Sequence, residues 1–403
     1  MSTPWSSQRL AASLFLVLGT DMFIVSPLLP RISTTFGVTT GEAAVVAWSF
    51  SLVYAVLSPV FALVSNRYTR RSAMVFGAVV FSAGALAVSL LPTLELVVAG
   101  RVLTAVGAAI MGPPIWSYVS ETAAPHETGK AVARVASTFA AGQIIGVPLG
   151  GFVAQFASWR WVFLGIAVLS AGLAVLIGMK LEQENRVPER ARISAAWRDS
   201  VGLWRKPVMT YLVVANFFAQ ATRYATYTFA GALLFTRFGM ETAELGLVGA
   251  AVGAGSLLGS MLGGHLVDRV HAGQGSQTLL NCIYAAVMTC SVVLATAGGN
   301  EWLALAGWVI TFAAGSAFVS NGQELLTRSA GKDRAYALSW NNAALYAGTA
   351  AGSFTLALLP LGGPLFIVTA GALGALTLVA SALLWWRTGD ETDPTAQTTR
   401  TNS

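Results

Sequence analysis

The chain has 403 residues, of which 55% are hydrophobic and only 10% are charged. A soluble globular domain carries about 25% charged residues, so the composition excludes a water-soluble protein and indicates a lipid environment. The pI near 9.5 would suit nucleic-acid binding, but the basic residues lie in short connectors between apolar runs, which argues against it. Backbone groups in lipid must bond internally, and long apolar runs without alternation favour helices over a barrel.

Twelve apolar runs follow one another along the chain, and each can cross the roughly 30 Å of hydrocarbon in a bilayer. They cover residues 10–30, 43–65, 72–91, 95–118, 132–155, 161–181, 208–234, 243–267, 277–297, 302–326, 335–358 and 364–386. We therefore predict an all-α integral membrane protein with twelve transmembrane helices. The first run continues past Pro30 without a small-residue cleavage site, so we expect it to remain as a helix.

The longest polar segment divides these runs into six and six. This division predicts an N-terminal six-helix bundle at 1–181, a cytoplasmic linker at 182–206, a C-terminal six-helix bundle at 207–387 and a disordered cytoplasmic tail at 388–403. Nineteen of the 24 lysines and arginines fall on the side that holds both termini, and three fall on the other side. The positive-inside rule then places both termini in the cytoplasm, with the chain in the inner membrane of a cell.

An internal repeat supports the division into halves. The segment 62–67, after the second run, and the segment 264–269, after the eighth, are similar and lie 202 residues apart. Parallel repeats related by a pseudo-twofold axis are a known transporter plan, with the substrate site at their interface near the membrane midplane.

The motifs in these loops and helices resemble those of the major facilitator superfamily, within it the twelve-helix drug:proton antiporters. Residues 62–71 resemble the loop signature G-x-L-a-D-R-x-G-R-[RK], although Ala62, Asn66 and Thr69 depart from it. Arg101 with Gly107-Ala108-Ala109 is similar to the helix 4 motif, and residues 142–151 are similar to the helix 5 antiporter motif, with Pro148 shifted by one place. Residues 21–30 and 158–163 are also family-like, so the match covers essentially the whole chain.

The resemblance implies a proton-coupled secondary transporter that exports small, partly apolar, drug-like molecules by alternating access. It also implies a role for Arg101 in proton transfer; a structural arginine that caps carbonyls of neighbouring helices is the alternative. Two other functions stay open: a sugar or metabolite effluxer or facilitator, and a membrane receptor or scaffold that does not transport. The expected partners are a small-molecule substrate, protons and the bilayer, and we expect a monomer.

Asp21, midway along the first run, is the strongest single candidate for function. A carboxylate in hydrocarbon is costly and marks a functional site by default, so we expect Asp21 to serve as a proton and substrate site; stabilisation of a helix kink is the alternative. Arg223 lies near the middle of the seventh run, the repeat partner of the first. Two buried opposite charges on symmetry-related helices invite a pair, so we predict that Asp21 and Arg223 face one central cavity and can approach each other. The alternative is that Arg223 snorkels outward.

Further polar and aromatic residues could line that cavity. The candidates are Gln143, Tyr224, Tyr227, Asn341, Asn342 and Tyr346. We expect the arginines of the two repeated loops to latch the halves together, with binding of lipid headgroups as the alternative. The latch candidates are Arg67, Arg70, Arg71, Asp268 and Arg269.

Glycines at spacings of four place small residues on one helix face and allow close approach of backbones. The family resemblance implies that helices 5 and 8, and 2 and 11, meet across the halves, where such surfaces would suit rocking. The helix-packing candidates are Gly142, Gly146, Pro148, Gly150, Gly253 and Gly259. The sequence contains no phosphate-binding Gly-Lys-Ser/Thr loop, metal-ligand cluster or nucleophile–base set, so we expect no ATP motor, cofactor, metal or enzymatic activity.

Overall fold

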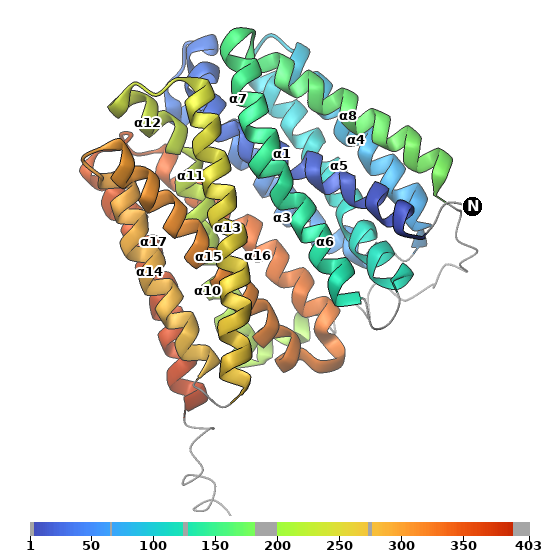
Figure 1. Ribbon diagram of the computed structural model, residues 1–403, viewed down its shortest axis with the longest axis vertical. Coiled ribbons are helices and arrows are strands. Elements are labelled where there is room, and N and C mark those ends of the chain that lie inside the picture. Colours follow the sequence, from blue (N-terminus) through green and yellow to red (C-terminus); the bar gives the residue numbers. More distant parts are fainter. Residues whose placement is uncertain (1–3, 65–66, 124–127, 182–199, 273–275, 390–403) are drawn as a thin grey trace, which may run out of the picture.

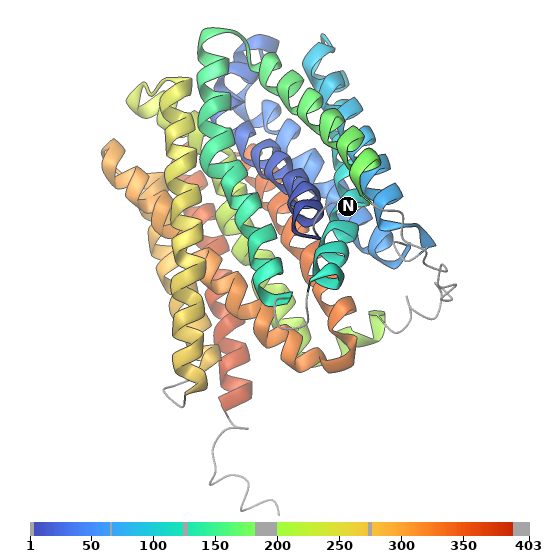
Figure 2. The same cartoon turned by 45° about the vertical axis from the view of Figure 1, so that its right-hand side comes forward.

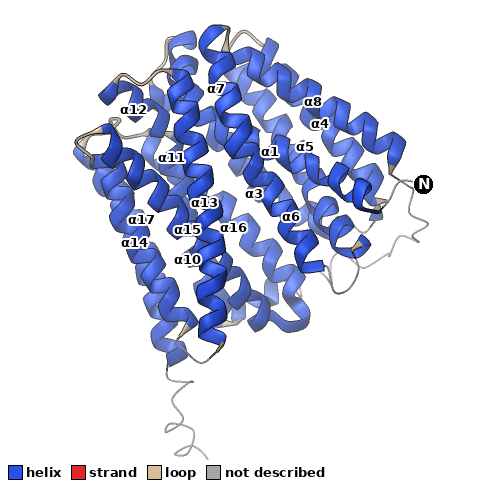
Figure 3. Ribbon diagram, in the orientation of Figure 1, coloured by secondary structure: helices blue, strands red, loops and turns tan. Residues whose placement is uncertain are grey.

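The computed structural model describes residues 4–64, 67–123, 128–181, 200–272 and 276–389. All regular secondary structure in these ranges is helical (Figure 3). The fold is therefore all-α, as predicted from the length of the apolar runs. Polar caps fix where several helices begin, because a side-chain oxygen there accepts a bond from an otherwise unpaired backbone N–H. These caps are Thr69, Thr93, Ser158, Ser276 and Asn300.

The first half of the chain forms six rods, some of them built from more than one helical segment. They are α1 (Pro4–Phe36), α2 with α3 (Thr40–Ala43 and Val45–Val64), α4 (Arg70–Leu90), α5 (Leu94–Thr122), α6 with η2 and α7 (Thr128–Ala141, Gly142–Gly146 and Val147–Phe156), and α8 (Trp159–Lys180).

The second half repeats this order. Its rods are α10 with η4, α11 and α12 (Pro207–Gln220, Ala221–Ala225, Thr226–Thr228 and Ala230–Phe238), α13 (Thr242–His271), α14 (Gln277–Ala297), α15 (Glu301–Ala330), α16 (Arg334–Ala357) and α17 (Pro364–Gly389). The two short segments η2 and η4 are π-helical turns inside otherwise α-helical rods. Such turns widen the helix locally and often occur at functional sites.

Ten of the described helices are long and apolar enough to cross a membrane by themselves. The two remaining rods are α10–α12, which is broken by η4, and α16. Both carry buried polar side chains in their middle turns, among them Asn216, Arg223 and Asn341. Twelve rods thus match the twelve predicted spans, and the two least apolar rods both contribute residues to the interface between the halves.

The predicted linker at 182–206 is described only over its last seven residues. Leu203–Arg205 forms a 3₁₀ turn, and Leu203 is buried in one apolar cluster with Met209 and Leu212 of α10. An apolar contact of this kind anchors the start of the second half. Residues 182–199 and 390–403, which contain most of the predicted linker and tail, lie outside the described residues.

The two halves lie side by side, with the first half at the right and the second at the left in Figure 1. In the first half α4 packs between α5 and α8, and in the second α14 packs between α15 and α17. Between the halves, α7 packs against α13 and α3 packs against α16. The ribbons of α7 and α13 run together at one end, whereas α6 and the end of α13 diverge towards the other (Figure 1 and Figure 2).

Candidate functional site: a buried ion pair beside a cavity between the halves

Asp21 on α1 forms a buried ion pair with Arg101 on α5. Both carboxylate oxygens accept hydrogen bonds from Nη1 of Arg101, at 2.7 and 2.8 Å. Their side chains are 0% and 1% exposed, so the pair is removed from solvent and lipid. A buried charge pair persists when its remaining hydrogen-bonding capacity is also satisfied, and Arg101 meets part of this condition with a further bond. Its Nε donates to the Val46 carbonyl of α3 at 3.0 Å.

The pair therefore joins three helices of the first half at one point. The ring of Phe50, also on α3, lies 4.8 Å from the guanidinium carbon of Arg101, a distance that gives a cation–π contact. Arg101 thus caps a carbonyl of a neighbouring helix, as the structural alternative expects, and it also pairs with Asp21, which the sequence did not indicate. Its role in proton transfer stays a prediction.

The predicted pairing of Asp21 with Arg223 is wrong in this structure, because Arg101 occupies both oxygens of Asp21. Arg223 is 3% exposed and lies inside the second half, so it does not snorkel outward either. Its Nη2 donates to the hydroxyls of Ser256 on α13 and Ser316 on α15, at 3.3 and 3.1 Å. Helical periodicity places both charges at mid-span, but it cannot show which neighbouring helix each side chain meets.

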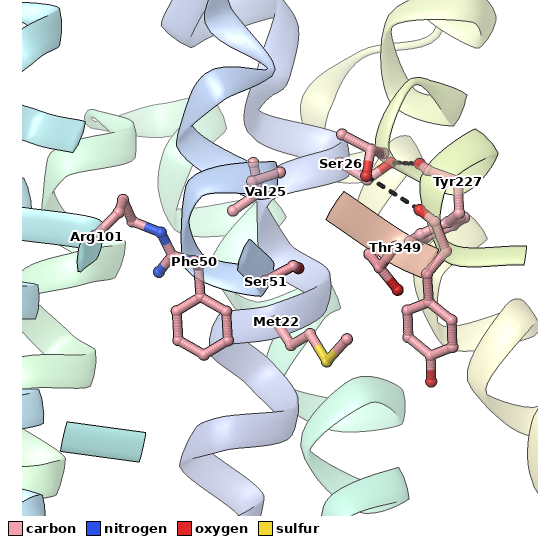
Figure 4. A pocket seen from close by; sticks show the side chains of 11 residues that line it. Met22, Val25, Ser26, Phe50, Ser51, Arg101, Tyr227 and Thr349 are labelled. Carbon is pink, nitrogen blue, oxygen red and sulfur yellow. Dashed lines mark hydrogen bonds between the residues drawn. The ribbon is translucent and has the colours of Figure 1, made fainter. Parts of the chain in front are cut away.

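A small cavity lies between the halves beside the ion pair. Its volume is about 20 Å³, enough for roughly one water molecule. Arg101 and Phe50 lie on one side, and Tyr227 and Thr349 lie on the other (Figure 4). Tyr224 also contributes to the lining. The guanidinium of the ion pair is therefore at the wall of a space shared by both halves.

Ser26, another lining residue, was missed from the sequence. Its hydroxyl donates to the Tyr227 carbonyl at 2.5 Å and accepts from the backbone N–H of Gly231 at 3.2 Å, so it joins α1 to the second half (Figure 4). Only the contact with a distant segment distinguishes this serine from the many others in the helices. No local sequence signal identifies it.

The other predicted cavity residues lie at different places along the interface. Tyr346 of α16 packs at a tilt against Tyr54 of α3, with ring centroids 4.1 Å apart, and Asn342 donates to the Ser58 hydroxyl at 3.0 Å. Both contacts join the halves. Asn341 instead accepts from Asn216 of α10 at 2.8 Å, within the second half.

Gln143 is 2% exposed on the π-helical turn η2, and its amide nitrogen has no hydrogen-bond partner among the described residues. Its side chain packs against Gly253 of α13, where an added Cβ would lie 3.0 Å from Cγ of Gln143. Gln143 therefore also lies at the boundary between the halves.

The glycine surfaces face other helices than predicted. A Cβ added to Gly142 or Gly146 would meet backbone or side-chain atoms of α1, within the same half, at about 2 Å. Gly150 likewise faces Ile24 of α1, Gly259 faces Ala313 of α15, and the glycines of α16 face α10 and η4. The ladder of every fourth residue on helix 5 therefore packs its own half, and only Gly253 of the predicted glycines lies at the boundary.

The contact between α7 and α13 across the halves depends on other glycines. A Cβ on Gly151 would lie 2.7 Å from the Thr242 carbonyl, and a Cβ on Gly246 would lie 3.0 Å from Cα of Pro148. The first distance leaves no room for a side chain, and the second would require the neighbouring helix to shift by a few tenths of an ångström. Gly151 and Gly246 thus allow the two helices to touch by their backbones, which the spacing alone did not indicate.

The ends of the molecule differ in how the halves meet. At the end where α7 finishes and α13 begins, Arg31 donates to the Thr242 hydroxyl at 2.7 Å, and the backbone N–H of Ala243 donates to Gln155 at 2.8 Å. The amide of Gln155 also bonds to Glu241. We call this the closed end.

At the opposite end, the bonds of the predicted latch arginines among the described residues stay within one half. Arg70 pairs with Glu121 of α5, and Arg71 donates to the Gly178 carbonyl of α8, so both bond within the first half. Arg67, Asp268 and Arg269 are exposed. Because α6 and α13 diverge here, these residues lie on surfaces that do not meet. Asn66, the departure from the loop signature, lies outside the described residues.

This chain is similar in sequence and in fold to known membrane transporters. The chain is 25% identical over 346 residues to the uncharacterised MFS-type transporter YceJ of Bacillus subtilis (strain 168), covering 85% of this chain and 86% of that protein. It is 26% identical over 390 residues to the chloramphenicol resistance protein of Streptomyces lividans, covering 91% and 92%. Its fold is similar to the crystal structure of a D-xylose-proton symporter, with a TM-score of 0.77 at 18% identity, covering 95% of this chain and 98% of that one.

The family model for the Major Facilitator Superfamily matches residues 11–320 and 212–402, which together span almost the whole chain. Two six-rod halves, a charged group buried at mid-span and a cavity where the halves meet agree with this match. The chain belongs to the Major Facilitator Superfamily and is a membrane transporter, not an enzyme.

Proposed function

We propose that this transporter exports small, partly apolar molecules in exchange for protons, with Asp21 as the proton site. One observation supports this above the others: Asp21 is the one carboxylate in the buried core of the described residues, and its partner Arg101 lines the cavity between the halves. Similarity to a chloramphenicol resistance protein supports export of drug-like compounds. The chain would act as a monomer in the cytoplasmic membrane, with both termini inside.

Protonation of Asp21 would couple the proton to the substrate through Arg101. A neutral carboxyl group no longer attracts the guanidinium as an ion, and its OH can accept only weakly. Arg101 would then be free to turn from α1 towards the cavity that it already lines. A change of charge at the wall of the cavity alters the affinity for a substrate and the contacts between the halves, which is what coupling requires.

The asymmetry of the two ends supports alternating access. With the termini in the cytoplasm, the closed end faces the outside, and the end at which α6 and α13 diverge faces inward. Contacts at the closed end are a few hydrogen bonds and glycine-mediated backbone contacts. Surfaces of this kind can separate without exposing a large apolar core, as rocking of one half against the other demands.

Reconstituted protein tests the proposal. In proteoliposomes with an imposed pH gradient, chloramphenicol should move against the proton flow, and Asp21→Asn should abolish this proton-driven movement. Asp333→Asn is the matched control, since Asp333 is partly exposed and lies 3.9 Å from Lys206, away from the cavity. Proton-driven transport that survives in Asp21→Asn would remove Asp21 from the proposed role. If the internal pH of the proteoliposomes does not respond to any compound in a panel of drugs and sugars, the proposed exchange of substrate for protons is refuted.

A further inference from the structure

Arg223 carries a buried positive charge that no carboxylate of the described residues neutralises. Asp21 is taken by Arg101, and the partners of Arg223 are two serine hydroxyls. Its Nε is buried without a hydrogen-bond partner. A buried charge without an ionic partner strongly disfavours the folded state, so its presence at mid-span suggests that something outside the chain supplies the negative charge.

The surroundings of Arg223 hold the guanidinium in place without neutralising it. The rings of Tyr224 and Phe312 lie 4.9 and 4.8 Å from its guanidinium carbon, which gives two cation–π contacts. Gly315 of α15 leaves room for the side chain, because a Cβ there would lie 2.1 Å from Cδ of Arg223. The π-helical turn η4 carries the residue at this position. Several independent features thus accommodate an arginine whose own bonding is incomplete.

This site adjoins the cavity between the halves. Tyr224 lies against Arg223 and also lines that cavity. Phe23 of α1, two residues from Asp21, packs on Tyr224 and Phe312 with ring centroids 5.1 and 6.1 Å apart. An aromatic cluster therefore separates the ion pair of the first half from the arginine of the second. A ligand in an enlarged cavity would meet aromatic rings first and the guanidinium beside them.

The repeat shows what is missing in the second half. Asp21 and Arg223 are 202 residues apart, the offset that also relates the two loop copies. At mid-span the first half supplies both an acidic residue, Asp21, and a basic residue, Arg101. At the equivalent position the described residues of the second half supply only the basic residue Arg223.

We propose that Arg223 binds the anionic group of the transported substrate, which would be an amphipathic anion with an aromatic or apolar body. This proposal rests on the transport function proposed above and adds a substrate class to it. A guanidinium can donate two parallel bonds to a carboxylate or sulfonate, and the buried Nε provides one donor for them. The rings of Phe23, Tyr224 and Phe312 would pack on the apolar body.

Binding of two matched probes tests the inference on purified full-length protein. Naphthalene-2-sulfonate carries a permanent negative charge, and naphthalene-2-sulfonamide has the same ring and nearly the same shape without it. Titration calorimetry should show that wild type prefers the sulfonate by about tenfold or more, as expected for a charge-assisted hydrogen bond. Arg223→Gln should reduce this preference to about twofold or less, and Arg223→Lys should retain part of it.

Arg160→Gln is the control, because Arg160 bonds to the carbonyls of Ser89 and Leu91 near the closed end, outside the cavity. It should keep the full preference. Equal affinity of wild type for both probes, or an unchanged preference in Arg223→Gln, would overturn the inference. Proton-driven transport of the neutral chloramphenicol by the same preparations separates the two proposals: if it persists while the probes bind equally, the transport function stands and the anion site fails.

Discussion

At the scale of the residue, Asp21 and Arg101 form the most deeply buried ion pair among the described residues. The partners are 80 residues apart in sequence and belong to different helices. Taking two charges out of water costs more than their attraction returns unless the geometry is good. Replacing a buried ion pair by apolar residues is often neutral or stabilising, so the presence of this pair at mid-span favours a role in transport over one in stability.

We expect variants of the ion pair to differ in their free energy of unfolding. Asp21→Asn alone should lower the free energy of unfolding by about 3–5 kcal/mol, because it leaves Arg101 charged and unpaired in the core. The double variant Asp21→Asn with Arg101→Gln should recover most of this loss, because it removes both charges. Denaturant or thermal unfolding in detergent measures the difference.

Transport by the double variant separates structure from function. It should fold nearly as well as wild type and still lack proton-driven transport. If restored stability also restored coupling, the ion pair would be a structural contact only.

At the scale of the element, α7 and α13 form a backbone contact between the halves at the closed end. Their backbones touch at Gly151 and Gly246, whereas the ladder of Gly142, Gly146 and Gly150 holds α1 within the first half. A bulky residue in that ladder would disturb the packing of one half. We therefore expect opening of the closed end to depend on the other glycine face, which carries Gly151 and Gly246.

Gly246→Leu should open the closed end. The Cβ of leucine would already lie 3.0 Å from Cα of Pro148, and the rest of its side chain would push the two helices apart. The conformation described here should therefore become less favourable than one with α7 and α13 apart. In a background without Cys282 and Cys290, a cysteine at Ser26 should react with an impermeant maleimide about tenfold faster in this variant. Gly264→Leu on the same helix is the control, because a Cβ there meets nothing within 4 Å. Equal labelling of both variants would show that Gly246 does not control access.

At the scale of the whole molecule, the two halves meet tightly at one end and diverge at the other. Arg31, Gln155 and Thr242 join them at the closed end, while Arg70 and Arg71 of the predicted latch bond within their own half. The latch arginines would meet the other half only in a conformation in which the end where α6 and α13 now diverge is closed. This arrangement is one of the two that the proposed alternating access would need.

Cross-linking tests whether the closed end must open during transport. Cysteines at Gln155 and Ala243, again without Cys282 and Cys290, should form a disulfide under oxidation and reduce transport by roughly tenfold or more, because the halves can no longer separate there. A reductant should restore the activity. Cysteines at Ser82 and Ala167, which contact each other within the first half, provide the control and should leave transport unchanged. Full activity of the oxidised Gln155–Ala243 pair would contradict rocking about this contact.

The sequence by itself determined the membrane class, the number of spans, the family and which residues carry charge at mid-span. These follow from composition, run length and motifs, and such signals are local along the chain. Asp21, Arg101 and Arg223 could be identified as candidates because a charge in an apolar run stands out whatever surrounds it.

Only the tertiary structure decided how those residues combine. Asp21 could pair with either arginine, and the choice depends on how α1 is rotated against α5 and η4, which periodicity within one helix does not fix. The same rotation turns the regular glycine ladder of helix 5 towards α1 and leaves Gly151 and Gly246 at the boundary. Contacts between helices distant in sequence are set by the packing of whole rods. The partner of Asp21, and the lack of a carboxylate beside Arg223 among the described residues, therefore emerge only when the helices of each half are assembled.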